Sequence, residues 1–242
     1  MALPGISRRS HAGEDLKFGL TPVFLTNDLE LLELLKAYLE AATRRSVRLI
    51  QRRTYQEITS LLLGGQLDAA WICGYPYVRY RPRLQLLALP VWRGRPVYQS
   101  YLIVSADREA EKFEGLQGDI HAFSDPDSNS GYLVTTALLA ERGLHPSEFF
   151  SRTFFTYGHR NVVRAVSSGL AQSGSVDGYV WEVLNETEPG LTKGTRILRK
   201  SEWLGFPPLA GPAVPRDQGA TLKLAKAFLQ MHHHKEGLQI LN

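Results

Sequence analysis

A short segment with three serine hydroxyls holds the residues of this chain best suited to bind a small oxyanion. It reads Ser124-Asp125-Pro126-Asp127-Ser128-Asn129-Ser130-Gly131 and leads into a predicted helix over 130–142. The first turn of a helix has unpaired N–H groups and a partial positive charge. Ser128 and Ser130 can therefore present hydroxyl groups to an oxyanion or oxyacid beside those N–H groups. The same residues can instead form an ordinary helix cap after a turn.

Cys73 is the single cysteine, and it directly follows a buried strand predicted over 67–72. Ligands of open α/β sheets bind at the carboxyl ends of strands, so the thiol can face a ligand there. Such a site would suit arsenous acid, a neutral oxyacid with a thiophilic centre, because one thiol can displace one hydroxyl. The candidates for hydrogen bonds to the other hydroxyls are Ser128, Asn129, Ser130, His159 and Asp177. Alternatively, Cys73 is a small buried hydrophobic residue.

A catalytic use of the same side chains is a competing hypothesis. Cys73, His159 and Asp177 can be imagined as nucleophile, base and orienting group. No glycine-rich phosphate loop, zinc-spacing motif or acyl-transfer elbow accompanies them in the sequence. We therefore expect a protein that is not an enzyme and that needs no cofactor.

The composition is that of an ordinary globular protein of 242 residues, long enough for one large or two small domains. The formal net charge of +4 is only mildly basic, and lysine and arginine are scattered along the chain. A local arginine cluster, which we expect to be a solvated face, consists of Arg44, Arg45, Arg48, Arg52 and Arg53. Since no basic helix or stripe stands out, we predict no nucleic-acid partner.

Membrane and targeting segments are not evident in the sequence. No run of about 18 apolar residues occurs, which predicts that no segment spans a membrane. Residues 1–13 lack the apolar stretch of a signal peptide. The protein is therefore either cytosolic, or its signal peptide is missing from this sequence.

Strand-like and helix-like segments alternate along the chain, which predicts an α/β architecture with parallel sheets. Strands are predicted over 16–20, 47–50, 67–72, 84–91, 98–104, 120–123, 153–157, 176–180 and 197–199. Helices are predicted over 28–42, 55–63, 130–142, 161–168, 218–231 and 234–241, with a short turn or helix at 74–76. The alternation occurs twice, so we expect two lobes joined by crossing strands, with 98–104 and 206–214 as the candidates.

An ordered series of short motifs covers the chain after residue 16. It includes Phe18-Gly19-Leu20-Thr21-Pro22, Gly65-Gln66-Leu67-Asp68-Ala69-Ala70-Trp71, Asp125-Pro126 with Ser128-Asn129-Ser130-Gly131, Gly158-His159 and Val176-Asp177-Gly178. With this series the chain resembles the phosphonate-type periplasmic solute-binding proteins, which bind phosphate, phosphite or phosphonates. The resemblance implies a type II periplasmic-binding fold with a ligand between two lobes. Lobe 1 would comprise 14–99 plus 205–242, and lobe 2 would comprise 100–204.

The resemblance also implies the residues of the site. In that family a Ser-x-Ser turn, a following histidine and a tyrosine in the cleft hold the oxyanion. The matching residues are Ser128, Asn129, Ser130, His159 and Tyr98, with Tyr55 on the opposite lobe. The middle position is often threonine, so Asn129 replaces a hydroxyl by an amide. Asp177 would lie near the cleft, where it can meet a ligand amine, accept a hydrogen bond from a neutral hydroxyl, or simply end a strand.

Cys73 and the following Gly74-Tyr75-Pro76-Tyr77 also resemble the arsenite-sensing branch of this family. Those periplasmic proteins bind arsenite through a cysteine and report to a membrane histidine kinase that controls arsenite oxidation. On this basis the first hypothesis is a periplasmic arsenite sensor with arsenic bound to Cys73. The alternative is the substrate-binding component of an ABC transporter, which hands phosphate, phosphite or phosphonate to a permease.

Overall fold

Two five-stranded sheets organise the computed structural model, which describes residues 15–22 and 29–241. The first sheet has the strand order β2-β1-β3-β12-β4. Its strands are β1 (Leu16–Leu20), β2 (Val47–Gln51), β3 (Ala69–Trp71), β4 (Leu84–Ala88) and β12 (Leu209–Pro212). Its helices are α1 (Leu29–Thr43), α2 (Tyr55–Leu63), α3 (Gly74–Arg79), α9 (Gln218–Leu229) and α10 (Lys235–Leu241). We call this unit the first body.

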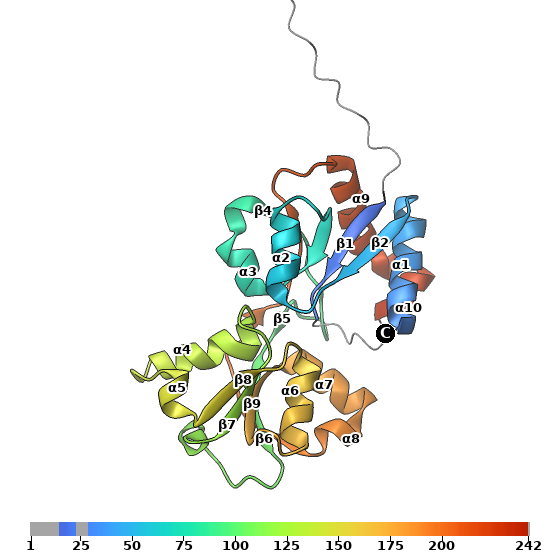
Figure 1. Cartoon of the computed structure of the whole chain (residues 1–242). Helices are drawn as coiled ribbons and strands as arrows, with labels where there is room; N and C mark the ends of the chain where they lie inside the picture. The colour runs from blue at the N-terminus through green and yellow to red at the C-terminus, as the bar shows by residue number, and fades with distance from the viewer. Residues whose placement is uncertain (1–14, 23–28, 242) are drawn as a thin grey trace, which may run out of the picture.

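Apolar residues at helical spacing explain how the first body is covered on both faces. Leu35 and Leu39 of α1 pack with Leu224 of α9 against β1 on one face. Ile58 and Leu62 of α2 pack against β3 on the other face. Figure 1 shows α2 and α3 on one side of the sheet and α1, α9 and α10 on the opposite side.

The second body is built in the same way around the sheet β10-β6-β9-β7-β8. Its strands are β6 (Ser100–Ser105), β7 (Ile120–Phe123), β8 (Arg152–Phe155), β9 (Ser173–Asp177) and β10 (Thr195–Lys200). Its helices are α4 (Val134–Ala140), α5 (Pro146–Phe149), α6 (His159–Ser167), α7 (Gly178–Thr187) and α8 (Pro189–Thr192). Within the described ranges, no helix is long and apolar enough to cross a membrane.

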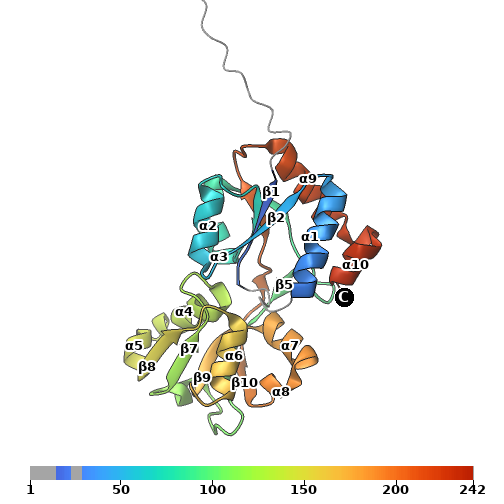
Figure 2. The same cartoon turned by 45° about the vertical axis from the view of Figure 1, so that its right-hand side comes forward.

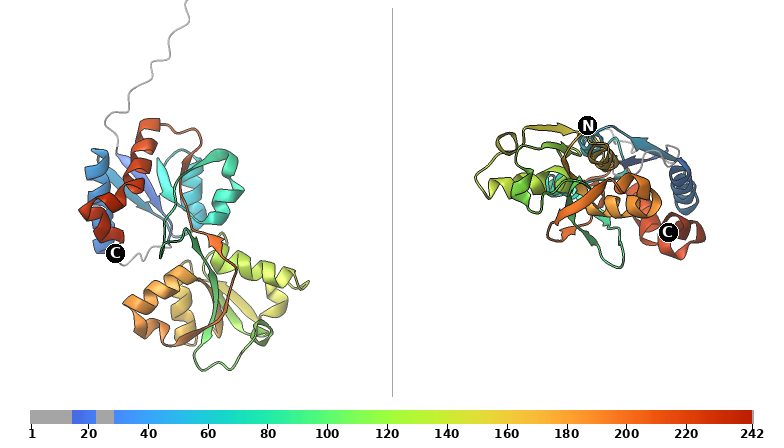
Figure 3. Two further views of the ribbon diagram at one scale, coloured as in Figure 1. Left: turned by 180° about the vertical axis from the view of Figure 1, so that it is seen from behind. Right: turned by 90° about the horizontal axis from the view of Figure 1, so that it is seen from below.

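A two-stranded antiparallel ribbon connects the bodies, formed by β5 (Val97–Tyr98) and β11 (Leu204–Gly205). The ribbon lies between the two bodies in Figures 1 and 2, and the view from behind in Figure 3 shows the chain passing twice through this region. The predicted strand 98–104 is thus divided at Gln99 into β5 and β6. The second crossing occurs at β11, slightly before the predicted 206–214, because β12 already belongs to the first sheet.

The expectation of parallel sheets is wrong for one strand of each sheet, the one next to an edge strand. β12 runs antiparallel to β3 and β4, and β6 runs antiparallel to β9 and β10. Each of these strands enters its sheet from the connecting ribbon, at the edge where the parallel strands end. A strand that enters at that edge must run in the opposite direction to its parallel neighbours.

The predicted strand 176–180 is also wrong, because β9 ends at Asp177 and α7 begins at Gly178. Val176 and Val180 are typical of a strand, but Asp177 accepts hydrogen bonds from the backbone N–H groups of Tyr179 and Val180 and so starts a helix. The smaller residues that precede Val176 form the strand instead. A Cβ atom on Gly174 would lie 2.6 Å from Val162 Cγ1, so close packing against α6 requires the small residue.

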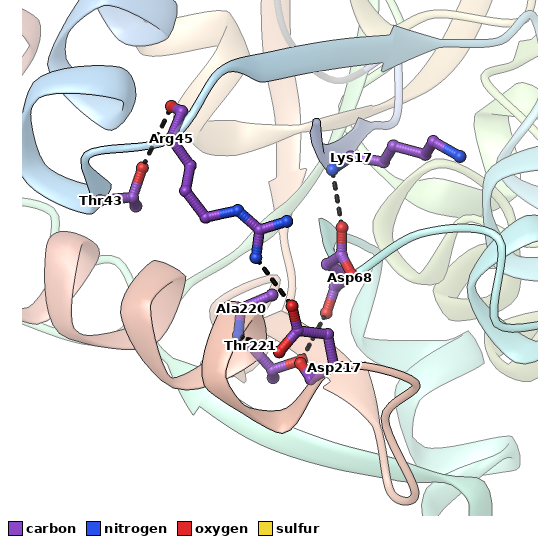
Figure 4. Close-up of polar contacts among 7 residues, drawn as sticks. All are labelled: Lys17, Thr43, Arg45, Asp68, Asp217, Ala220 and Thr221. Atoms are coloured by element: carbon purple, nitrogen blue, oxygen red, sulfur yellow. Dashed lines mark hydrogen bonds and ion pairs between the residues drawn. The ribbon is translucent and has the colours of Figure 1, made fainter. Parts of the chain in front are cut away.

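A polar cluster stabilises the edge of the first sheet where β1, β2 and β3 begin (Figure 4). This edge is opposite to the one at which the three strands end. The backbone N–H of Lys17 donates to Asp68 Oδ2 at 2.8 Å. Arg45 forms an ion pair of 2.7 Å with Asp217, the N-cap of α9. Thr221 Oγ1 donates to the carbonyl of Asp68 at 3.2 Å. These contacts attach α9 to the starts of β1 and β3 and leave the opposite edge of the sheet for the site.

Candidate ligand-binding site

The predicted site residues come together between the two bodies, at the ends of the parallel strands. The first body supplies Tyr55, the first residue of α2, and Cys73, which lies between β3 and α3; the ribbon supplies Tyr98. The second body supplies Ser128, Asn129 and Ser130 after β7, His159 at the start of α6, and Asp177 at the end of β9. All of these residues are buried except Asn129, which is half-buried.

The hydrogen bonds of His159 define where its proton lies. The backbone N–H of Asp177 donates to His159 Nδ1 at 3.0 Å, so Nδ1 carries no proton. Burial lowers the pKa of His159 to about 3, which keeps the ring neutral at physiological pH. The ring proton is therefore on Nε2, which lies 3.1 Å from the hydroxyl oxygen of Tyr55. His159 donates to Tyr55, and the hydroxyl proton of Tyr55 remains available for a further acceptor.

Asp177 is a buried carboxyl group in the site. Burial raises its pKa to about 7, and the shift is only partly opposed by hydrogen bonds from the N–H groups of Val180 and Tyr179 and from the Ser130 side chain. At neutral pH the carboxyl group is thus poised between its protonated and ionised forms. It can donate a hydrogen bond to a ligand oxygen or accept one from a ligand hydroxyl.

Cys73 lies at the boundary between the bodies. Its Sγ accepts a hydrogen bond from the backbone N–H of Asn129, in the other body, at 3.3 Å. Burial raises the pKa of Cys73 to about 11, although the hydrogen bond from Asn129 opposes the shift. The group is therefore a protonated thiol at neutral pH, and it faces the polar segment of the second body.

The polar segment forms a π-helical turn over Asn129–Leu133 in place of the ordinary helix start predicted at 130. Ser128 Oγ accepts from the N–H of Gly131 at 3.0 Å, so Ser128 does act as a helix cap. Burial raises the pKa of Tyr98 well above its usual value, and side-chain hydrogen bonds with Ser130 and Asn129 partly oppose the shift. The two interpretations of this segment thus apply to different residues: Ser128 caps, whereas Ser130 faces Tyr98 and Asp177.

Three further residues support the site, and the sequence analysis assigned none of them a role. Asp125 Oδ2 accepts from the backbone N–H of Tyr55 at 3.1 Å. Ser100 Oγ donates to the carbonyl of Ser130 at 2.6 Å. Ser124 is fully buried beneath the turn, and a Cβ atom on Gly131 would lie 1.8 Å from its Oγ. Ser124 and Asp125 belong to the polar segment that the sequence singles out, but nothing in the sequence indicates their partners.

The chemistry of the site is that of recognition by neutral groups. Its side chains are hydroxyls, an amide, an imidazole, a thiol and a carboxyl group, with no lysine or arginine among the residues described above. Both ring nitrogens of His159 bond to groups other than Cys73, so the imagined Cys–His pair is not formed. Within the described part of the chain, no group of three or more His, Cys, Asp or Glu side chains could hold a metal ion.

Comparison with known proteins gives a family match that covers most of the chain. The family model of the periplasmic substrate-binding protein of phosphonate ABC transporters matches residues 18–242. A phosphate-import protein, PhnD of Mycolicibacterium smegmatis, is 28% identical over 150 residues. That alignment covers 56% of this chain and 46% of the relative, so the chain matches less than half of the relative's length.

Two solved structures have the same fold. A binding protein component of an ABC phosphonate transporter from Pseudomonas aeruginosa superposes with a TM-score of 0.84 at 20% identity, covering 94% of this chain and 78% of the other. PhnD1 from Prochlorococcus marinus, solved in complex with methylphosphonate, gives a TM-score of 0.80 at 20% identity, covering 93% and 88%. The expected α/β, type II periplasmic-binding fold is confirmed.

Proposed function

Because the chain belongs to the family of periplasmic substrate-binding proteins of phosphonate ABC transporters, we propose that it captures a small phosphorus oxyacid between its two bodies and delivers it to a permease. Phosphate, phosphite and methylphosphonate are the candidate ligands. The protein would act in the periplasm, where the members of this family work. It would bind and release its ligand unchanged, as a carrier and not as an enzyme.

The observation that supports this proposal best is that the site is assembled from both bodies. Tyr55 and Cys73 of the first body contact His159 and Asn129 of the second body, at 3.1 and 3.3 Å. A ligand held by both sides would stabilise the closed arrangement, and only its differential affinity for that arrangement can shift the equilibrium. We propose that closure moves lobe 1, residues 14–99 plus 205–242, against lobe 2, residues 100–204, about the ribbon.

The absence of a cationic side chain among the residues placed at this site restricts the protonation state of the ligand. Phosphate would meet the hydroxyl groups of Tyr55, Tyr98 and Ser130, which donate hydrogen bonds but carry no positive charge. Asp177 would repel an oxyanion unless one proton is shared between the carboxyl group and a ligand oxygen. The proposed complex therefore holds one proton between Asp177 and the ligand.

The test is a calorimetric titration of the protein with phosphate, phosphite and methylphosphonate. At least one ligand should bind, and Ser130→Ala should lower the affinity for that ligand by about tenfold, the effect of losing one buried hydrogen bond. Ser147→Ala, in the exposed start of α5, serves as the matched control. Failure of all three ligands to bind would refute the proposal, as would equal affinity in Ser130→Ala.

Arsenite is the second candidate ligand, and the position of Cys73 favours it. The thiol lies between the bodies, where a ligand held by the second body would meet it. Condensation of the thiol with arsenous acid forms one S–As bond and releases one hydroxyl and the thiol proton as water. A protonated thiol is therefore sufficient. A histidine kinase would be the partner, but the family match favours transport over sensing, so this hypothesis ranks second.

Cys73→Ser separates the two candidates. Serine keeps an oxygen that accepts from Asn129 but cannot form the S–As bond. Arsenite binding that disappears in this variant, while circular dichroism remains unchanged, would support the sensor. Binding of a phosphorus oxyacid that survives the substitution would support the transport component.

A further inference from the structure

Tyr55 is held at both ends by the second body. Its hydroxyl lies 3.1 Å from His159 Nε2, and its backbone N–H donates to Asp125 Oδ2 at 3.1 Å. Asp125 belongs to the loop after β7, whereas Tyr55 opens α2 in the first body. Both hydrogen bonds therefore join the two bodies, and a single residue of the first body makes both of them.

Asp125 is held in place for this contact. The residue is 1% exposed, and its second oxygen, Oδ1, accepts from the backbone N–H of Asp127 at 2.8 Å. Burial raises the pKa of Asp125, but the hydrogen bonds from Asp127 and Tyr55 favour the ionised form. One oxygen of the carboxyl group thus accepts a hydrogen bond from its own loop, and the other accepts one from the first body.

The N-terminus of α2 provides a fitting partner for a carboxylate. Thr54 and Glu57 form a capping box that satisfies the N–H groups of Thr54 and Glu57. The N–H of Tyr55 is not part of that box, and it is satisfied by Asp125 from the other body. A carboxylate at a helix N-terminus is stabilised by the helix dipole and by a charge-assisted hydrogen bond.

We propose that Asp125 is a positioning residue, whose contact with the backbone of Tyr55 forms on closure and holds the Tyr55 hydroxyl against His159. The inference rests on the proposed function, because it concerns closure around the same ligand. Asp125 itself need not touch the ligand. When the bodies separate, the carboxylate and the N–H group are both released to water, so the contact stabilises only the closed arrangement.

The test combines ligand binding with the amide signal of Tyr55, followed by NMR in protein labelled with ¹⁵N-tyrosine. Methylphosphonate, phosphite and phosphate serve as probes for the wild type and for Asp125→Asn, Asp125→Ala and Asp127→Asn. Asp127→Asn removes the same charge from the same loop, but Asp127 is not the acceptor of the Tyr55 N–H. It is therefore the matched control.

Addition of a probe that binds should shift the signal of the Tyr55 amide proton downfield in the wild type and in Asp127→Asn. Asp125→Ala should abolish this shift. It should also lower the affinity for the probe by about tenfold, mainly through faster dissociation. Asp125→Asn should fall between the two, because its single carbonyl oxygen cannot serve both N–H groups. A role in folding alone would not change the Tyr55 amide signal at saturating probe.

Two results would overturn the inference. One is a Tyr55 amide that shifts equally in Asp125→Ala, and the other is wild-type affinity and dissociation rate in that variant. If no probe binds the wild type, the proposed function fails, and closure around a ligand fails with it. If a probe binds the wild type but the Tyr55 amide shifts equally in Asp125→Ala, the inference alone is overturned.

Discussion

The charge of the site is set by burial at single residues. His159 is kept neutral because a buried imidazolium would be poorly solvated, and its N–H then points at Tyr55. The pKa of Asp177 is raised to about 7 for the same reason. Burial thus removes the positive charge of His159, which would attract any anion. It leaves the Asp177 carboxyl group, which repels an oxyanion unless the two share a proton. The site should therefore discriminate ligands by protonation state as well as by shape.

The first prediction concerns the pH dependence of binding. Above the pKa of Asp177 and of the ligand, the complex must take up one proton, so affinity should fall by about tenfold per pH unit. Asp177→Asn places an amide donor there and removes the need for that proton. Calorimetric titration between pH 6 and 9 should show the loss of affinity in the wild type and a nearly flat profile in the variant. A parallel decline in both proteins would contradict the assignment.

At the scale of elements, β7 and β9 enclose a second neutral histidine. His121 is fully buried, and its Nδ1 and Nε2 each lie 2.8 Å from a hydroxyl oxygen, of Ser173 and Ser175 respectively. Burial lowers the pKa of His121 to about 3. Because a protonated ring would be a buried charge without solvation, acid should destabilise the packing of this pair of strands.

The second prediction follows from the sign of that shift. An unfolded chain binds a proton at His121 below pH 6.5, whereas the folded chain does not until about pH 3. The contribution of neutral His121 is fully present above pH 6.5. The free energy of unfolding should fall by about 1.4 kcal/mol per pH unit between those values for this group, with His159 adding a similar loss.

Urea denaturation from pH 7.5 to 4.5 measures this slope. Asp177, whose pKa is raised to about 7, changes stability in the opposite direction over this range. Below pH 6.5, His121→Asn should therefore make the slope less steep by about 1.4 kcal/mol per pH unit, whatever its effect on stability at pH 7.5. His145→Gln, which changes an exposed histidine, serves as the matched control. An unchanged slope in His121→Asn would show that this histidine does not couple folding to protons.

Local signals predicted some elements to the residue. The helix α2 was predicted as 55–63 because its apolar residues have helical spacing and two glycines follow it. The strand β9 was misplaced because it begins with the small residues Ser173, Gly174 and Ser175, which form a strand only through packing against α6. The antiparallel direction of β12 and β6 was also missed, since direction depends on where the chain re-enters each sheet.

The candidate site was predicted more fully than the elements that support it. The residues from Ser128 to Ser130, together with His159 and Asp177, followed from the ordered motifs. Asp125 lies in those motifs, but the sequence assigns it no role, because its partner is the backbone N–H of Tyr55, 70 residues away in sequence. Contacts with backbone groups across two bodies leave no side-chain pattern in a sequence.

At the scale of the whole molecule, the two bodies meet at contacts of different expected strength. Arg93 pairs with Glu182 and Glu186 of α7 at 2.6 and 2.5 Å, but its side chain is 57% exposed, so this pair should contribute little. The buried contacts of Tyr55 exclude water and should contribute more. Closure is therefore expected to depend on the site itself and less on the surface around it.

Small-angle X-ray scattering of the protein with and without a bound phosphorus oxyacid tests the central claim most directly. Phosphate, phosphite and methylphosphonate would each be added at saturating concentration to the wild type and to Ser130→Ala. We predict that at least one of them decreases the radius of gyration of the wild type, and that this decrease needs a higher concentration in the variant. No change with any of the three ligands, or a ligand that binds without compaction, would contradict capture between the two bodies.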